Sequence, residues 1–303
     1  MLKPIIFSTI LMSSITLQAN PWDLVGYDVN ESSEFSLTDG AVYSDANDLH
    51  EELLSDGYNP AGDYFNDLDI EVDPFSDRVF GSDDRKRITS TTGWPWRTMG
   101  QIEFRDASGR SKICSGTLVG PRHVMTAAHC IYSSAAYSTP PKRGWHSSVR
   151  FFPGRNGSSD PYGGVSATYL LSVTGYTQND NYKYDYGMVI LSENIGDRVG
   201  WMAFGTRSNL VNYKLNMVGY PGEKTSGTMW KTWDKIDTQE DTIFTTLGDW
   251  TGGQSGGPIY LYNSSSSSRT IHGIIICENN SYNTGRRINR AAFDRFVDWK
   301  NNY

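Results

Sequence analysis

The stretch "DWTGGQSGGPIY", residues 249–260, places a single serine among four glycines and leads directly into an apolar segment that favours a β-strand. A hydroxyl attacks a carbonyl when a base removes its proton, and the resulting oxyanion needs backbone N–H donors directed at it. Glycines let the backbone turn so that successive amides converge. The stretch predicts Ser255 as a nucleophile, with the amides of Gly253 and Ser255 as its oxyanion hole. A glycine-rich hairpin with a passive serine is the alternative.

His129 is the best candidate among five histidines for the base that Ser255 requires. It lies in "TAAHC", at the end of an apolar run, where its ring can emerge from a strand. We expect Cys130 to hold this turn through a disulfide with Cys114, an arrangement suited to an oxidising compartment. The third cysteine, Cys277, is expected to be a buried, small apolar residue.

Asp185 is the candidate carboxylate for orienting the histidine and stabilising its charged form. In "NYKYDYGMVIL" it lies between two tyrosines, immediately before an apolar run. The chain order His129, Asp185, Ser255 is one of the three orders in which such triads occur. Order and context together favour nucleophilic catalysis over the passive alternative.

Short apolar segments alternate with turn residues from residue 94 to residue 277, which predicts an all-β fold of barrels or sandwiches. The expected strands lie within residues 97–104, 111–120, 123–130, 149–154, 164–173, 186–192, 214–222, 258–263 and 269–277. Only the C-terminal residues have helical periodicity, with Phe293 and Phe296 on one face and Asn289 as a candidate N-cap. One amphipathic α-helix is expected to close the chain.

The first residues, "MLKPIIFSTILMSSITLQAN", have the layout of a secretory signal peptide: Lys3, an apolar stretch, and the small residue Ala19. We expect residues 1–19 to be removed and the protein to be secreted, to the extracellular space or the periplasm. Serines and threonines interrupt the apolar stretch, which disfavours a membrane anchor because a span needs about 20 mostly apolar residues.

Acidic residues are concentrated after this stretch. Residues 20–77 contain 16 Asp and Glu and no Lys or Arg, whereas residues 78–303 contain 26 basic and 18 acidic residues. A solvated tail can have this composition. We expect instead that residues 20–78 are a pro-segment, cleaved beside Arg78 or Val79, and that residues 79–303 are the catalytic domain. Attraction between opposite charges would hold the acidic segment on the catalytic domain. There the segment would either block the active site or help the domain to fold.

"LVGPRHVMTAAHC", "YDYGMVIL" and "GGQSGGPIY" resemble the His, Asp and Ser motifs of the chymotrypsin-fold, or trypsin-like, serine endopeptidases. "GSDDRKRITSTT", "VGWMAFG", "VGYPGEK" and "SYNTGRRI" are similar to the glutamyl endopeptidase, or V8-like, branch, so that the likeness covers about residues 79–303. The resemblance implies two packed six-stranded antiparallel β-barrels with the active site between them. His129 and Asp185 would come from the first barrel and Ser255 from the second.

The sequence departs from that branch in the substrate pocket. Its members receive a substrate carboxylate with a hydroxyl residue five positions before the serine and a histidine in a later strand, and here these positions are Trp250 and Ile275. Neither Trp250 nor Ile275 can donate to a substrate carboxylate as the family's hydroxyl and histidine do. Burying that carboxylate without a partner is unfavourable. Thr251, the imidazole of His272 (otherwise expected to be structural) and a freed Val79 amine could compensate in part. Trp250, Thr251 and Ile275 predict a shallow pocket for small or apolar P1 residues, with Cys277 close by. The alternative is that the alignment slips by a residue or two around the serine-rich loop of residues 263–268.

A second departure lies beside the nucleophile. In the digestive branch of the fold an Asp directly before the serine pairs with the new N-terminal amine that cleavage creates. Here that position is Gln254, so this ion pair cannot form. Cleavage near Arg78 is therefore expected to act in another way.

Two functions fit these observations: a secreted serine endopeptidase that works through an acyl-enzyme, and a protease-like binding protein without turnover. The complete triad favours the endopeptidase. Neither function needs a cofactor or a metal, because no cluster has the spacing of metal ligands. The basic residues are spread along the chain, which argues against nucleic acid. We expect protein or peptide substrates, no stable membrane association, and a monomer.

Overall fold

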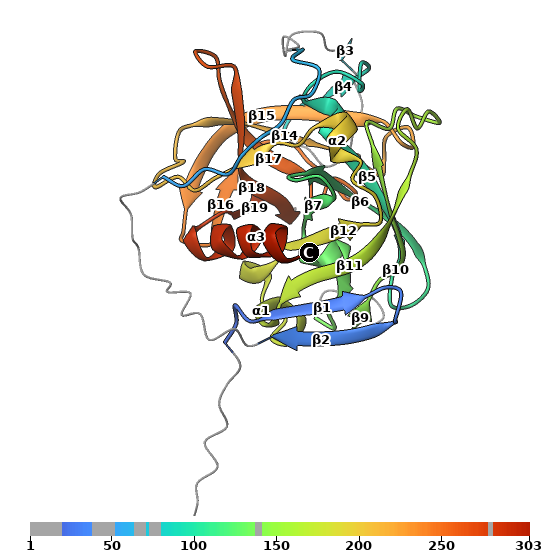
Figure 1. The fold of residues 1–303 in the computed structure, drawn as a ribbon. Helices are drawn as coiled ribbons and strands as arrows, with labels where there is room; N and C mark the ends of the chain where they lie inside the picture. The colour runs from blue at the N-terminus through green and yellow to red at the C-terminus, as the bar shows by residue number, and fades with distance from the viewer. Residues whose placement is uncertain (1–19, 38–51, 64–70, 73–79, 137–140, 278–280) are drawn as a thin grey trace, which may run out of the picture.

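Figure 1 shows two β-barrels packed together, with one C-terminal helix against them. The structure is a computed structural model, and it describes residues 20–37, 52–63, 71–72, 80–136, 141–277 and 281–303. The expected signal peptide and the expected cleavage position at Arg78 and Val79 lie outside the described residues. Within the described part, no helix is long and apolar enough to cross a membrane.

The first barrel has six antiparallel strands in the order β10-β5-β6-β7-β12-β11, and pairing between β10 and β11 closes it. These strands are β5 (Met99–Arg105), β6 (Ser111–Leu118), β7 (His123–Thr126), β10 (Ser147–Pro153), β11 (Val165–Val173) and β12 (Gly187–Leu191). Every residue of β12, the apolar run after Asp185, is buried. Its burial fixes the loop that carries the aspartate at one end of the barrel.

The second barrel has the order β14-β17-β18-β19-β16-β15, and pairing between β14 and β15 closes it. Its strands are β14 (Lys214–Gly219), β15 (Met229–Gln239), β16 (Ile243–Thr246), β17 (Pro258–Asn263), β18 (Ser268–Cys277) and β19 (Asn283–Arg287). Strand β13 (Ala203–Phe204) pairs with β18, and β4 (Lys86–Ile88) and β3 (Glu71–Val72) extend the sheet beyond β15. Two six-stranded antiparallel barrels confirm the all-β prediction.

The described helices are short except for the last. They are α1 (Thr174–Thr177), α2 (Gly196–Val199), α3 (Arg290–Asn302) and the 3-10 turns η1 (Trp96–Thr98), η2 (Ala128–Cys130) and η3 (Tyr182–Tyr184). The Asn289 side chain caps α3 by accepting a hydrogen bond from the Ala292 amide at 3.2 Å. Phe293 and Phe296 are buried. The predicted C-terminal amphipathic helix is therefore confirmed.

Several strands were not anticipated from the sequence. In the second barrel these are β15 and β19, whose sequences are rich in polar and charged residues, and β16, which has only four residues. Near the N-terminus, β1 (Leu24–Asp28) and β2 (Ser33–Leu37) form a hairpin that extends the sheet of the first barrel from β11. A small two-stranded sheet of β8 (Tyr132–Ser133) and β9 (Gly144–Trp145) completes the described elements. The acidic N-terminal region thus contributes regular structure to the fold.

Candidate active site

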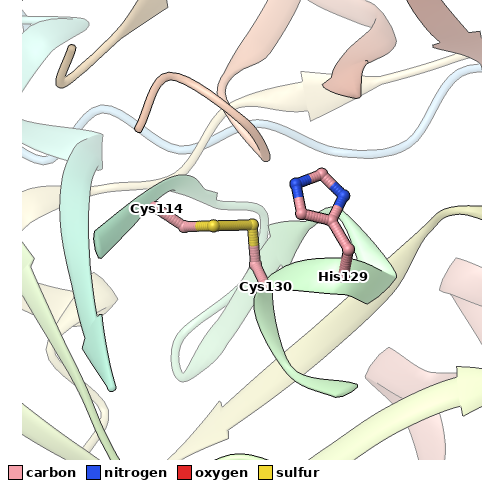
Figure 2. A group of neighbouring side chains, drawn as sticks. All are labelled: Cys114, His129 and Cys130. Atoms are coloured by element: carbon pink, nitrogen blue, oxygen red, sulfur yellow. A yellow bond between two sulfur atoms is a disulfide. The ribbon is translucent and has the colours of Figure 1, made fainter. Parts of the chain in front are cut away.

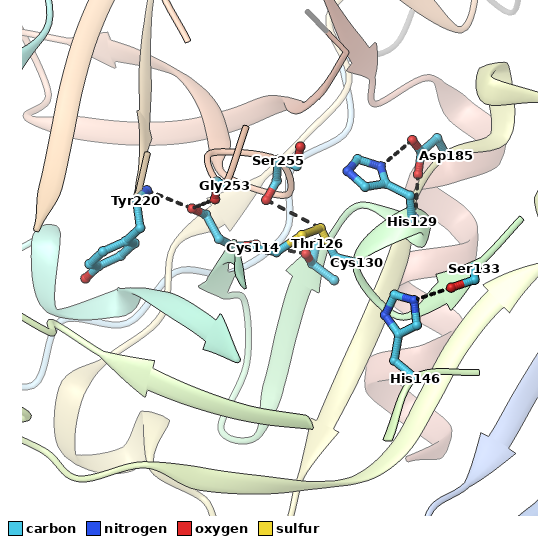
Figure 3. The surroundings of a disulfide bond; sticks show 11 residues. Cys114, Thr126, His129, Cys130, Ser133, His146, Asp185, Tyr220, Gly253 and Ser255 are labelled. Atoms are coloured by element: carbon cyan, nitrogen blue, oxygen red, sulfur yellow. Dashed lines mark hydrogen bonds and ion pairs between the residues drawn. A yellow bond between two sulfur atoms is a disulfide. The ribbon is translucent and has the colours of Figure 1, made fainter. Parts of the chain in front are cut away.

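His129 and Asp185 lie together at the end of the first barrel, as the sequence analysis expects (Figure 3). The backbone amide of His129 donates to Asp185 Oδ1 at 2.9 Å, and His129 Nδ1 lies 2.7 Å from Asp185 Oδ2. A carboxylate can only accept here, so the ring proton belongs on Nδ1. That tautomer leaves Nε2 with a lone pair, which is what a general base requires.

Ser255 lines the same cavity as His129 and Asp185, but from the second barrel, in the loop before β17. Gly253 and Gly256, on either side of it, have φ of +98° and +82°, which residues with a Cβ rarely adopt. A Cβ on Gly256 would lie 2.1 Å from the Thr126 hydroxyl oxygen, so the loop also has no room for one. Conformation and close packing explain why glycines surround the serine.

The amides of Gly253 and Ser255 are available for an oxyanion. Within the described residues, neither amide donates to another protein group, whereas the amides of Gln254, Gly256 and Gly257 all do. The two remaining donors belong to alternate residues of one tight turn. This arrangement can place two N–H groups on a developing oxyanion.

Ser115, which the sequence analysis did not single out, ties the serine loop to the first barrel. Its backbone amide donates to the Ser255 carbonyl at 2.7 Å, and its hydroxyl donates to the Gly253 carbonyl at 2.9 Å. The same hydroxyl accepts from the Tyr220 amide at 2.9 Å. These bonds join the two halves of the site across the interface between the barrels. A serine in a strand gives no sign of such a role, because its partners are distant in sequence.

The disulfide expected between Cys114 and Cys130 is present beside His129 (Figure 2). Ligand atoms of Cys114, His129 and Cys130 lie within 4.8 Å of one another, which superficially resembles a metal site. Both sulfurs are joined in the disulfide and offer no thiolate to a metal. The group therefore fits a structural cross-link that fixes the turn carrying His129.

A cavity of about 500 Å³ opens beside the three candidate residues. Both barrels line it, with His129, Asp185 and Ser255 at its edge and Ile276 and Cys277 as part of one wall. The remaining lining is mixed apolar and polar and comes mainly from the first barrel, with residues Phe104, Asp106, Arg110, Lys112, Ile113, Cys114, Tyr132, Ser133, Ser134, His146, Tyr176, Tyr182 and Gly253.

The three residues expected to form the substrate pocket are absent from this lining. Trp250 and Ile275 lie in the apolar core of the second barrel, with 1% and 0% of their surface exposed. The indole N–H of Trp250 donates to the Cys277 carbonyl at 3.0 Å, and Thr251 is bonded to Arg85. The strand residues that reach the cavity are instead Ile276 and Cys277, one and two positions further along.

Cys277 is exposed, so the expectation of a buried residue is wrong. The physical reason is a register shift between β18 and β19 at Ile275 and Cys277. Such an irregularity changes the direction of the side chains that follow it. The alternation of side chains between the two faces of β18 therefore does not continue to its last residue. The thiol of Cys277 lies at the cavity rather than in the core.

His272 and His146, which the sequence analysis did not assign to catalysis, are both buried. Nδ1 of His272 lies 2.9 Å from the Gly205 carbonyl, while the His146 ring stacks on Phe104 and contacts the Ser133 hydroxyl. Burial lowers the pKa of each histidine to about 4. Both rings are thus neutral near pH 7, and neither accounts for a titration in that range.

Activity should rise with pH as His129 loses its proton, with the midpoint above the ordinary histidine value of about 6.5. Burial lowers the pKa of His129, but the charge and hydrogen bond of Asp185 outweigh it, so its pKa is raised. Because the base must be unprotonated, activity falls as pH decreases through this raised pKa. Asp185→Asn should move the midpoint of kcat/KM to lower pH. A flat profile from pH 5 to 9 would contradict the assignment of His129.

Arg85, in the motif "SDDRKR", is a second residue that the sequence analysis did not assign. It is completely buried and donates from Nη1 to Thr251 Oγ1 at 2.9 Å and to Gln254 Oε1 at 2.7 Å. Its other nitrogens form ion pairs with Asp83 at 2.9 Å and Glu223 at 2.6 Å. The permanently charged Arg85 thus contacts Gln254, the residue directly before Ser255. This is the position where the digestive branch has an Asp.

Asp249 joins residues 80–85 to the loop that carries Ser255 at a second point. Its carboxylate accepts from the amides of Phe80 and Asp84 at 3.1 and 3.0 Å. Burial raises the pKa of Asp249 to about 6, against the opposing effect of these two hydrogen bonds. Residues 80–85 are therefore joined to the loop that carries Ser255 through both a carboxylate and a guanidinium.

Known proteins match both the sequence and the fold. The family model described as "Trypsin" matches residues 86–300. A glutamyl endopeptidase from Bacillus licheniformis is 38% identical over 230 residues, covering 74% of this chain and 69% of the relative. A protein from Bacillus subtilis named extracellular metalloprotease is 38% identical over 226 residues, covering 74% of this chain and 70% of that protein.

Among solved structures, a Glu endopeptidase in complex with MPD matches with a TM-score of 0.64 and 23% identity, covering 74% of this chain and 99% of its own. At that identity the match shows the fold. Together with the family model and the relatives at 38% identity, it shows that the chain belongs to the trypsin family of chymotrypsin-fold serine endopeptidases, in which it is similar to the glutamyl endopeptidase branch.

Proposed function

We propose that the protein is a secreted serine endopeptidase in which Ser255, His129 and Asp185 form the catalytic triad. The observation that carries this proposal is the placement of His129 Nδ1 against the Asp185 carboxylate, 2.7 Å away, opposite a glycine-rich loop that presents Ser255. The cavity that these residues line gives a peptide access to Ser255 and His129. Membership in the family makes proteins or peptides the substrates.

In the proposed reaction, the Ser255 hydroxyl attacks the peptide carbonyl carbon while His129 Nε2 removes its proton. The amides of Gly253 and Ser255 stabilise the oxyanion. His129 then gives the proton to the amine that leaves, and an ester to Ser255 remains. Water, deprotonated by His129, attacks this ester and restores the serine hydroxyl. Asp185 holds the ring orientation and stabilises the imidazolium formed in each half of the reaction.

A fluorophosphonate probe tests this function against the alternative of a protease-like binding protein. The folded protein should be labelled on Ser255, identified by peptide mapping, and should hydrolyse an unfolded protein substrate. Ser255→Ala should show neither reaction. A folded wild-type protein that takes up no label and cleaves no substrate would favour the binding function.

We expect P1 specificity not to be restricted to glutamate, although relatives are named glutamyl endopeptidases. Trp250 and Ile275 lie in the core, and the single N–H of the indole is already donated to a backbone carbonyl. Neither side chain can pair with a substrate carboxylate, and leaving one unpaired costs affinity. In a fluorogenic library, kcat/KM for Ala, Leu or Phe at P1 should equal or exceed that for Glu. A strong preference for Glu would refute this expectation.

Secretion, cleavage near Arg78 and a monomeric state complete the proposal. The signal-like first 19 residues and the disulfide support export. Among the parts of the acidic region whose side chains are described, residues 20–37 and 52–63, none lines the cavity at Ser255. This supports a role in folding rather than in blocking substrate. N-terminal sequencing of the active enzyme should show whether its catalytic chain begins at Arg78 or Val79.

A further inference from the structure

The region expected to be removed as a pro-segment is built into the sheet of the first barrel. Strand β1 pairs with β11 over five consecutive positions, from Leu24 opposite Val173 to Asp28 opposite Tyr169. Strand β2 pairs in turn with β1. Figure 1 shows this hairpin alongside β11 at the edge of the barrel. Continuous backbone pairing of this kind holds a strand whether or not it is covalently joined to the rest of the chain.

Trp22 anchors the start of the same segment in the protein core. Its side chain is 2% exposed, and its ring centroid lies 4.6 Å from that of Tyr184 in an edge-to-face contact. The buried guanidinium of Arg295 donates to the Trp22 carbonyl at 2.7 Å. Tyr184 directly precedes Asp185, so the tryptophan packs behind the loop that carries the catalytic carboxylate. A large buried aromatic residue is typical of a stable interface.

Residues 52–63 make a second set of contacts, on the chain that enters the second barrel. Tyr58 and Trp201 exchange backbone hydrogen bonds of 2.8 and 2.9 Å, and their ring centroids are 4.7 Å apart. At the end of this stretch the Asp63 carboxylate pairs with Arg97, whose guanidinium is buried. The hydrogen bond and charge of Arg97 lower the pKa of Asp63. The N-terminal region thus contacts both the first barrel and the connection to the second.

We infer that residues 20–63 stay bound to the catalytic domain after cleavage near Arg78, as a second, non-covalently attached chain. This inference rests on the proposed processing of the protein. The paired strands, the buried Trp22 and the contact of Asp63 with the buried Arg97 hold the segment. The more exposed ion pairs, Glu52 with Arg207 and Asp56 with Lys300, add little because exposed pairs contribute weakly. The mature enzyme is therefore a two-chain molecule in which the acidic chain supports the loop of Asp185.

The test uses the Ser255→Ala full chain, in which a recognition sequence for a site-specific protease replaces residues 73–79. After complete cleavage, both fragments should elute together in size-exclusion chromatography at low salt and in 1 M NaCl. They should separate only in denaturant. Release of the N-terminal fragment in native buffer would overturn the inference. Release by 1 M NaCl alone would also contradict it, because charge rather than strand pairing would then hold the fragment.

Variants and hydrogen exchange check which contacts hold the fragment. Trp22→Ala and Leu24→Ala should each release it from the cleaved protein, whereas the exposed control Glu31→Ala should retain it. If the two variants do not fold, amide exchange in the cleaved parent decides: the amides of β1 should stay protected, and rapid exchange there would overturn the inference. Retention is measured without turnover, so its failure is distinguishable from failure of the proposed protease activity.

Discussion

Ser255→Ala should leave a folded protein whose peptide hydrolysis is reduced by about six powers of ten, the scale known for triad deletions in another serine protease. His129→Ala should lose nearly as much, because the nucleophile and its base act as one unit. The double variant should be hardly worse than either single variant. Each effect is measured as kcat with a fluorogenic peptide, after confirming the fold by circular dichroism.

Ser166→Ala provides the matched control for the nucleophile, because Ser166 is an exposed serine of β11 in the first barrel. It should retain full activity. Substantial proteolysis by Ser255→Ala or by His129→Ala would refute the assignment. Additive losses in the double variant would show that the two side chains do not act in the same step.

Arg85→Met should be the most damaging substitution away from the triad. It removes the buried guanidinium and leaves Asp83, whose side chain is 1% exposed, with one partner fewer. Removing one member of a buried ion pair costs roughly 3–5 kcal/mol of unfolding free energy. Water screens the contribution of Glu223, which is 37% exposed, so the lower end of this range is expected. Chemical denaturation measures the loss.

The same substitution should also lower kcat under conditions in which the variant is folded. Gln254 Oε1 would lose the hydrogen bond from Arg85 and keep only the one from the Thr251 amide, and the Ser255 amide directly follows this residue in the chain. Arg150→Met is the control, since its guanidinium packs over the ring of Phe152 away from the serine loop. A loss of stability below about 1 kcal/mol, together with an unchanged kcat, would show that Arg85 supports neither the fold nor the loop.

The parts of the protein that could be predicted from its sequence are those that depend on local residue types. A tight turn around a serine needs backbone conformations that favour glycine, and Gly253 and Gly256 have positive φ. The terminal helix could be predicted because its cap, Asn289, and its apolar positions are close in sequence. Strands such as β12 could be recognised because every residue in them is apolar or small and buried.

The parts that could not be predicted depend on partners distant in sequence. Strand β19 contains Arg286 and Arg287, which suggest an exposed segment, yet both are buried. Arg286 donates to the Thr242 carbonyl at 2.7 Å, and Arg287 donates to the Arg207 carbonyl at 2.6 Å. Burial lowers the pKa of Arg286 to about 10. Hydrophobic periodicity cannot identify a charged residue that is buried against backbone carbonyls distant in sequence.

The position of β1 along β11 also bears on aggregation. On one edge of β11, β10 pairs only with residues 165–166, while β1 pairs with residues 169–173. Without β1, the apolar end of β11 would present unpaired N–H and C=O groups to any other extended chain. With the hairpin in place, the outer strand is instead β2, which is short, mostly exposed and carries Glu34. A short edge strand with a charged side chain is a poorer template for a second copy than the long apolar end of β11, so the N-terminal hairpin disfavours edge-to-edge association of the barrel.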